Sequence, residues 1–159
     1  MTYAQAINEA QEIALRRDPS VFVIGEGVPD PKGIFGTTTG LAAKFPGRVM
    51  DMPVSESAMT GVCVGSAIAG MRPIMVHARM DFTLYAFDAI VNTAAKWHDM
   101  FGRKQRVPLV IRMIIGRGWG QGPQHSQSLQ ALFAHIPGLN VVMPVAAGDA
   151  KGLLLAAIE

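Results

Sequence analysis

The sequence contains little cysteine, little charge and no long apolar run, and each shortage excludes a class of protein. Cys63 is the only cysteine in 159 residues, which excludes an internal disulfide framework and a multi-cysteine zinc site. Charged residues make up 16% of the chain, the net charge is +2, and no run of basic residues occurs, so we expect no binding to nucleic acid. The longest stretch of small apolar residues, from Ala58 to Met71, is too short and too rich in glycine to cross a membrane.

Hydrophobic residues are plentiful and make up half of the sequence. This share is high for a soluble domain, and it predicts a large buried interior or a large interface between subunits. The length is that of one domain with a substantial core. The N-terminus is polar, without the apolar segment of a signal peptide, and together with the single cysteine this favours a reducing compartment.

Apolar runs typical of strands alternate with helical patterns along the chain. Thr2 and Gln5 form a capping box that begins the first helix, and Asp18 with Pro19 ends it. The expected strands cover residues 21–24, 48–52, 73–76, 109–115 and 139–143. Further helices are expected at residues 41–44, from Ser55 or Ser57 to about 70, and at 81–101, 128–135 and 146–158. This alternation predicts an α/β fold in three layers, with a parallel sheet between helices on both faces.

In a parallel sheet, ligands bind beyond the carboxyl ends of the strands. These ends carry the loops at residues 25–37, 53–56 and 116–127. The last loop has a glycine at every second position from Gly116 to Gly122, followed by His125. A dinucleotide fingerprint is not supported because Gln121 stands where its third glycine belongs, and no G-x-x-x-x-G-K-[ST] motif occurs. His125 is interpreted either as a catalytic acid or base or as a structural hydrogen-bonding residue.

A single carboxylate, Glu56, lies between the second strand and a helix that carries the small residues Gly61, Gly65 and Ala69. Glu56 is interpreted either as a favourable acid in the first turn of that helix or as a carboxylate held in an apolar pocket for proton transfer. The other histidines have no metal-ligand spacing with one another or with Cys63, so we expect structural roles for them and no metal site.

Five segments together resemble one enzyme family. They read VSES, TGVCVGSAIAGMRPI, DFTLYAFDAIVNTAAKWHDM, QHSQSLQALFAHIPGLNVVMP and DAKGLLLAAI, in this order. They resemble the beta subunit of the decarboxylase component of 2-oxoacid dehydrogenase complexes, which include the pyruvate, branched-chain 2-oxoacid and acetoin dehydrogenases. The resemblance implies one transketolase-like pyrimidine-binding domain over residues 1–159, with the thiamine diphosphate-binding fold. This domain would stop short of the family's last strand and C-terminal domain.

The resemblance also implies roles for individual residues. Glu56 matches the glutamate that hydrogen-bonds the pyrimidine ring and so activates the cofactor for attack on the 2-oxo carbonyl. Phe82 matches the aromatic residue that packs on the face of the pyrimidine. Val54 matches an apolar residue of the same pocket, and Tyr85 lies where the family often has a polar residue near the cofactor.

Three loop residues complete this set. His125 matches the histidine that enters the family's active site, where it binds substrate or assists acyl transfer to the lipoyl arm. Glu26 is either a second carboxylate near the cofactor or a solvated loop acid. Trp119 makes the glycine loop bulkier than is common in the family, which implies altered access for substrate.

The family's motif for magnesium and diphosphate, GDG followed by an asparagine pair, does not occur in the sequence. In heteromeric members this motif lies on the alpha subunit. The resemblance therefore implies a heterotetramer with alpha chains, built around a homodimer of this domain. Thiamine diphosphate would be shared with the alpha subunit, which would hold the magnesium.

The activity implied by the resemblance is oxidative decarboxylation of a 2-oxoacid, with acyl transfer to a lipoyl acyltransferase core. The isolated chain would be inactive without its alpha subunit. We expect it in the cytoplasm of a bacterium or in the mitochondrial matrix of a eukaryote. The alternatives are a transketolase-like or deoxyxylulose-phosphate-synthase-like carboligase domain, or a non-catalytic assembly domain.

Overall fold

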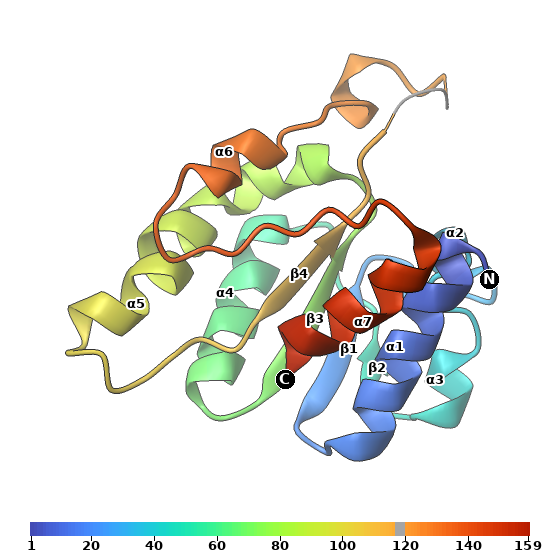
Figure 1. The fold of residues 1–159 in the computed structure, drawn as a ribbon, viewed down its shortest axis with the longest axis horizontal. Helices are drawn as coiled ribbons and strands as arrows, with labels where there is room; N and C mark the ends of the chain where they lie inside the picture. The colour runs from blue at the N-terminus through green and yellow to red at the C-terminus, as the bar shows by residue number, and fades with distance from the viewer. Residues whose placement is uncertain (117–119) are drawn as a thin grey trace.

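The computed structural model describes residues 1–116 and 120–159, which fold into a parallel sheet between two layers of helices (Figure 1). The sheet has four strands in the order β2-β1-β3-β4. They are β1 (Val21–Gly25), β2 (Val49–Met50), β3 (Arg72–His77) and β4 (Val110–Met113). Every neighbouring pair is parallel. The expected three-layer α/β fold is therefore confirmed.

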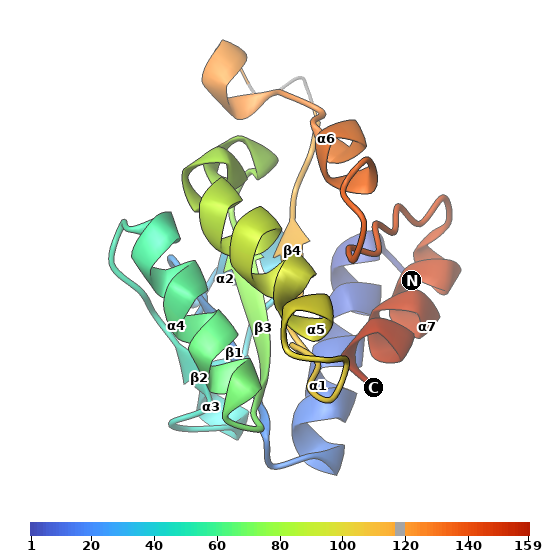
Figure 2. The same cartoon turned by 90° about the vertical axis from the view of Figure 1, so that its left-hand side faces the viewer.

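Helices cover both faces of the sheet (Figure 2). On one face, α1 (Tyr3–Arg17) and α7 (Ala147–Ile158) lie side by side. On the other face lies α4 (Glu56–Ile68), with the π-helical segment η2 and α5 (Ala95–Met100) beside it. The shorter segments are α2 (Gly33–Gly36), α3 (Leu41–Lys44), η1 (Met80–Ala86), η2 (Ala89–Ala94), η3 (Pro123–His125) and α6 (Gln130–Ala134).

The expected start of α1 is confirmed in detail. The Thr2 hydroxyl accepts a hydrogen bond from the Gln5 amide at 3.2 Å, and the Gln5 side chain accepts one from the Thr2 amide at 2.8 Å. This reciprocal capping satisfies two amides that have no partner within the helix. At the other end, Asp18 adopts extended backbone angles and α1 stops.

Alternate residues of β1 face two different cores, because successive side chains of a strand point to opposite faces. Val23 packs with Leu15 of α1, in the cluster that also includes residues of α7. Ile24 packs with Cys63 of α4 in a second cluster. Every residue of β1 is buried, which explains why this strand reads as a continuous apolar run.

The prediction of a strand at residues 139–143 is wrong. These residues form neither strand nor helix, and Val141, Val142 and Met143 are exposed. An apolar run becomes a strand only when a neighbouring strand supplies hydrogen bonds, and in the described part of the chain β4 pairs with β3 alone. The apolar pattern was present, but its pairing partner was not.

The helix expected at residues 81–101 is present as a continuous helical stretch over residues 80–100, but its hydrogen-bond pattern changes along its length. Residues 80–86 form the 3-10 helix η1, residues 87–88 are α-helical, residues 89–94 form η2, and α5 follows from Ala95. The Thr83 hydroxyl donates to the Met80 carbonyl in the first turn of η1, where the Met80 amide donates to the Ile114 carbonyl at 2.9 Å. These bonds tie the start of the segment to the residues after β4.

Candidate active site

Acidic residues gather at the carboxyl ends of two neighbouring strands. Glu26 follows β1 directly, and Asp51 follows β2, whose residue Met50 lies beside Ile24 of β1. The Asp51 carboxylate accepts two backbone hydrogen bonds, one from the Gly27 amide at 2.9 Å and one from the Met52 amide at 2.9 Å. Asp51 thereby joins the loop after β1 to the loop after β2.

Glu56 lies within electrostatic range of these two acids. The pKa of Glu26 is raised, first by burial and then by the negative charges of Glu56 and Asp51. The structure therefore brings together Glu26 and Glu56, which sequence reasoning had singled out separately. Asp51 was missed, although an acid directly after a buried strand is a signal that could have identified it.

Glu56 is the first residue of α4, and its side chain is largely enclosed because the residue is only 8% exposed. Ser55 occupies the N-cap position without making a side-chain capping bond. Within the described part of the chain, the Glu56 carboxylate accepts no hydrogen bond from a side chain or from the cap residue Ser55. A carboxylate with free acceptor capacity in a largely buried residue is suited to meeting a donor from outside the chain.

Phe82 and His125 meet at the ends of β3 and β4. Phe82 lies in η1, three residues after Arg79, and His125 is the last residue of η3. Their rings are 5.3 Å apart between centroids, at an interplanar angle of 87°. The Nδ1 atom of His125 is buried and has no hydrogen-bond partner among the described residues.

The segment that carries His125 is held against the residues that follow β3. The Asp81 carboxylate accepts hydrogen bonds from the Gln127 amide at 3.3 Å and from the Gln127 side chain at 2.8 Å. The Arg79 guanidinium donates to the Gln121 side chain at 2.9 Å. Sequence reasoning missed Asp81 and Gln127, because no local pattern connects residues so far apart in the chain.

Val54 and Tyr85 lie on the surface of this chain, 81% and 70% exposed. The structure places them close in sequence to Glu56 and Phe82 but does not enclose them. Their contact with a cofactor stays a prediction that needs a bound ring or a second chain to complete the pocket. Trp119, expected to alter substrate access, lies outside the described residues.

No group of three or more His, Cys, Asp or Glu side chains within residues 1–116 and 120–159 is placed to hold a metal ion. In the same residues, no helix combines the length and apolar composition needed to cross a membrane.

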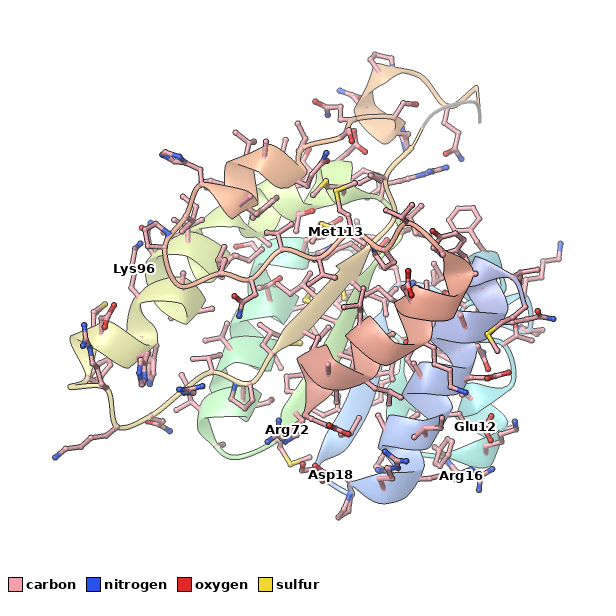
Figure 3. All side chains as sticks on the ribbon, in the orientation of Figure 1. Glu12, Arg16, Asp18, Arg72, Lys96 and Met113 are labelled. Atoms are coloured by element: carbon pink, nitrogen blue, oxygen red, sulfur yellow. The ribbon has the colours of Figure 1, made fainter. Side chains whose placement is uncertain are left out.

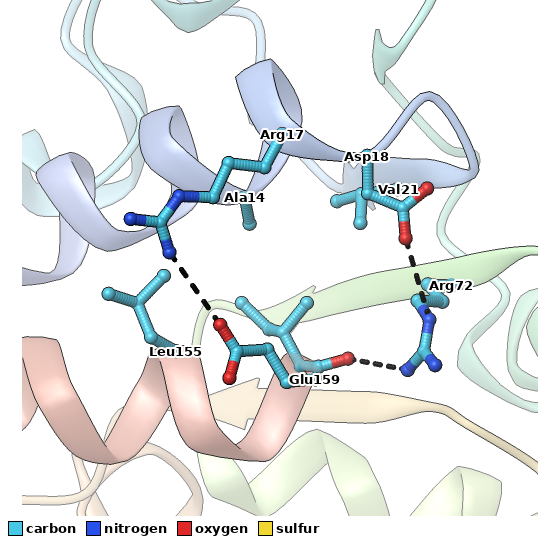
Figure 4. Close-up of a pocket in the computed structure, with 8 residues that line it drawn as sticks. Ala14, Arg17, Asp18, Val21, Arg72, Leu155 and Glu159 are labelled. Carbon is cyan, nitrogen blue, oxygen red and sulfur yellow. Dashed lines mark hydrogen bonds and ion pairs between the residues drawn. The ribbon is translucent and has the colours of Figure 1, made fainter.

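A surface pocket lies at the amino ends of the strands, beside the first residues of β1 and β3 (Figure 4). Arg72 lines it, paired with the Asp18 carboxylate at 3.5 Å and donating to the Ile158 carbonyl at 2.7 Å. Figure 3 shows Asp18 and Arg72 at one end of the sheet and Met113, the last residue of β4, towards the other. These arginine contacts close the ends of α1 and α7, and the pocket is separate from the candidate site.

Comparison with known proteins identifies relatives of this chain. It is 47% identical over 164 residues to the acetoin:2,6-dichlorophenolindophenol oxidoreductase subunit beta of Cupriavidus necator, covering 97% of this chain and 48% of that protein. It is 43% identical over 160 residues to the mitochondrial pyruvate dehydrogenase E1 component subunit beta-2 of Oryza sativa subsp. japonica, covering 100% of this chain and 43% of that protein. The chain thus spans about half the length of the curated relatives it matches.

A solved structure described as a split gene transketolase, inactive beta4 tetramer, matches with a TM-score of 0.75. The match covers 98% of this chain and 47% of that chain at 20% identity, so the likeness concerns the fold alone. The model of the family described as transketolase, pyrimidine binding domain, matches residues 1–159. The chain therefore belongs to the transketolase pyrimidine-binding domain family.

Proposed function

We propose that this chain is the pyrimidine-binding part of the beta subunit of a thiamine diphosphate-dependent 2-oxoacid dehydrogenase. That enzyme would decarboxylate a 2-oxoacid oxidatively and pass the acyl group to a lipoyl arm. One observation carries the proposal. Buried Glu56 follows β2, and the paired rings of Phe82 and His125 follow β3 and β4, so all three come after the carboxyl ends of parallel strands. The name of the pyruvate dehydrogenase relative supports this class of reaction, so pyruvate is the first 2-oxoacid to test. The name of the other relative makes acetoin, which has no carboxyl group, the substrate to test for oxidative cleavage.

The side chains at this edge fit an aminopyrimidine ring. Glu56 is a largely buried residue whose carboxylate accepts no hydrogen bond from a side chain within the described residues, so it can accept one from a proton at a ring nitrogen. Phe82 is half-buried and offers an aromatic surface for stacking. Val54 and Tyr85, exposed in this chain, would be covered by the bound ring or by a partner chain.

Thiamine diphosphate, when bound, would supply the carbanion chemistry that loss of carbon dioxide from a 2-oxoacid requires. This chain would supply position and proton control. Glu56 would keep a proton at the pyrimidine ring, and His125 would hydrogen-bond the substrate or assist acyl transfer. Glu26, whose pKa is raised beside Glu56, would serve as a second carboxylate near the cofactor.

The proposed assembly follows from what the described residues lack. They contain no cluster of acidic or histidine side chains for a metal, so we assign magnesium and the diphosphate group to an alpha subunit. The beta-subunit names of the relatives support such a partner. We further propose a homodimer of this domain within a heterotetramer, a lipoyl acyltransferase core as a later partner, and a bacterial cytoplasm or mitochondrial matrix as its location.

The test is a calorimetric titration of thiamine diphosphate and magnesium into this chain, with and without a candidate alpha chain. We expect tight binding only in the mixture. Glu56→Gln should bind the cofactor with similar affinity and lose decarboxylation by about 100-fold or more, because the proton at the ring is no longer controlled. Glu9→Gln is the matched control, since Glu9 is a surface acid of α1 paired with Lys151 at 2.8 Å.

Two results would contradict the proposal. One is a Glu56→Gln enzyme that decarboxylates pyruvate, or oxidatively cleaves acetoin, as fast as Glu9→Gln. The other is tight cofactor binding by this chain alone, with no effect of the alpha chain on affinity or rate.

A further inference from the structure

We propose that Asp81 is a positioning residue, which holds Gln127 and thereby sets the place and orientation of His125 against Phe82. The hydrogen bonds of Asp81 within the described residues go to Gln127 and not to His125. The inference rests on the proposed function, because it concerns how the chain presents His125 to that active site. It adds a residue outside the set identified from sequence.

Asp81 binds both the backbone and the side chain of Gln127. One oxygen of the Asp81 carboxylate, Oδ1, accepts from both the Gln127 amide at 3.3 Å and the Gln127 side-chain nitrogen at 2.8 Å. Gln127 is two residues beyond His125. Fixing the main chain at Gln127 therefore limits how far the imidazole can move.

Burial gives this contact its strength. Asp81 is only 6% exposed, and its second oxygen, Oδ2, is buried without a hydrogen-bond partner among the described residues. A buried carboxylate is costly unless donors reach it, and hydrogen bonds to an ionised acceptor are stronger than neutral ones. Release of Gln127 would leave the Asp81 charge without either of its recorded donors, so the held arrangement is strongly favoured.

The loop has few other ties between Gly122 and Ser128. The His125 amide and the Ser126 hydroxyl both bond to the Gly122 carbonyl, which is a contact within the loop. Within the described part of the chain, the other hydrogen bonds from residues 122–128 go to Asp81, from Gln127, and to Gln130 at the start of α6, from the Ser128 hydroxyl. The ring contact with Phe82 is the second hold on this segment.

The flanks of the loop meet the same short stretch of chain. On one side, Arg79 donates to Gln121 at 2.9 Å. On the other side, the Leu129 amide lies 3.1 Å from the Met80 sulfur. Consecutive residues from Arg79 to Phe82 thus contact the loop at four places, and Asp81 supplies the buried charge among them.

Loss of this hold should reduce catalytic rate more than cofactor affinity. His125 would still lie near Phe82, but its nitrogen atoms would no longer have one preferred position. A displacement of about 1 Å at a reacting group costs about 100-fold in rate. We expect Asp81→Ala to lower kcat by about 10- to 100-fold, while the Kd for thiamine diphosphate changes by less than about 3-fold.

The experiment compares Asp81→Ala, Asp81→Asn and Gln127→Ala in the assembly with the alpha chain. Asp81→Asn keeps an acceptor oxygen and should restore part of the rate lost in Asp81→Ala. The matched control is Asp88→Asn, because Asp88 also accepts an amide hydrogen bond, from Asn92 at 2.7 Å, but is exposed. Asp88→Asn should leave kcat unchanged.

A double substitution separates positioning from general stability. If Asp81 acts through His125, Asp81→Ala should cost little further rate once His125→Ala is present. A purely structural role would instead give the same loss in both backgrounds, and that result would overturn the proposal. If Asp81→Ala fails to fold, Gln127→Ala carries the same comparison.

A second readout does not depend on enzyme activity. The Cε1 proton resonance of His125, measured by NMR on the chain, should shift in Asp81→Ala and Gln127→Ala and stay unchanged in Asp88→Asn. Unchanged His125 resonances in both test variants would overturn the positioning role. The two proposals can fail separately. If the His125 resonance shifts in the variants but the wild-type assembly decarboxylates no 2-oxoacid, the positioning role is supported and the proposed function is contradicted.

Discussion

The phenyl ring of Phe82 meets the imidazole ring of His125 edge-on, with centroids 5.3 Å apart and ring planes at 87°. Aromatic rings favour this arrangement because the positive edge of one ring meets the negative face of the other. Phe82 follows β3 and His125 follows β4. The contact therefore joins the carboxyl ends of two neighbouring strands, where parallel sheets place their ligand sites.

Phe82→Leu should disturb this contact and little else. We expect it to shift the ring-proton resonances of His125 and to lower the free energy of unfolding by about 1 kcal/mol. The control is Phe87→Leu, because the Phe87 ring packs against the Phe133 ring, with centroids 5.7 Å apart, in a hydrophobic cluster around Ile90. Phe87→Leu should cost similar stability and leave the His125 resonances in place. His125 resonances that respond equally to both substitutions would contradict the pairing.

The pKa of Glu26, directly after β1, should respond to the acids near it. Burial raises the pKa of Glu26 first, and the charges of Glu56 and Asp51 raise it further. Glu56→Gln and Asp51→Asn should therefore each lower the pKa of Glu26, and neither should bring it fully to its ordinary value because burial remains. NMR titration of the Glu26 side-chain carboxyl carbon measures this. No movement of the Glu26 pKa in Glu56→Gln would show that the two side chains do not face each other.

The order of elements was largely predictable from sequence, because each element carries its own local signal. The Thr2 capping box and the residues around Pro19 bound α1, and the apolar run at β1 predicted a buried strand. The strand expected at residues 139–143 was wrong, because an apolar run does not specify a hydrogen-bonded neighbour. The helix expected at residues 81–101 is present over residues 80–100, but side-chain periodicity did not specify the 3-10 and π-helical turns within it.

The candidate site was predictable only in part, for a similar physical reason. Glu56 and His125 were singled out from local sequence and Phe82 from the family resemblance, and the structure pairs Phe82 with His125. Asp51 becomes a neighbour of Glu26 only when β1 and β2 pair in register. The bond between Asp81 and Gln127 likewise exists only after β3 and β4 are side by side. Such contacts are properties of the tertiary fold and leave no local pattern.

Arg112 of β4 is a buried cation that depends on one neutral partner. Its guanidinium donates to the Thr37 hydroxyl at 2.8 Å, and its Nε and Nη1 atoms have no partner among the described residues. Burial lowers its pKa to about 10, so it stays charged at neutral pH. We expect Thr37→Val to lower the free energy of unfolding by about 1–3 kcal/mol, because it leaves the guanidinium less satisfied.

Two comparisons test this account of Arg112. Thr38→Val removes a neutral hydroxyl bond to the Val28 carbonyl, 2.9 Å long, and should cost less than Thr37→Val in urea unfolding. Arg112→Met should cost less than Arg112→Ala, since an apolar side chain of similar length fills the space without a charge to satisfy. A larger loss for Thr38→Val than for Thr37→Val would count against the charged bond.

His77, the last residue of β3, should make stability depend on pH. Burial lowers its pKa from 6.5 to about 4, because the low-polarity interior disfavours the charged ring. Between these two values the unfolded chain binds a proton at this residue and the folded chain does not, so stability rises with pH there. The contribution is fully present above about pH 6.5 and is lost as the pH falls towards 4. Its size is on the order of 3 kcal/mol.

Urea unfolding of wild type and His77→Gln at pH 7, 5.5 and 4.5 isolates this contribution, because other groups titrate equally in both proteins. The buried glutamine has its own cost, but that cost does not change with pH. The difference in free energy of unfolding between the two proteins should therefore shrink by about 2–3 kcal/mol from pH 7 to pH 4.5. A constant difference for His77→Gln would mean that the folded chain admits a proton at His77, through a local opening of the carboxyl end of β3.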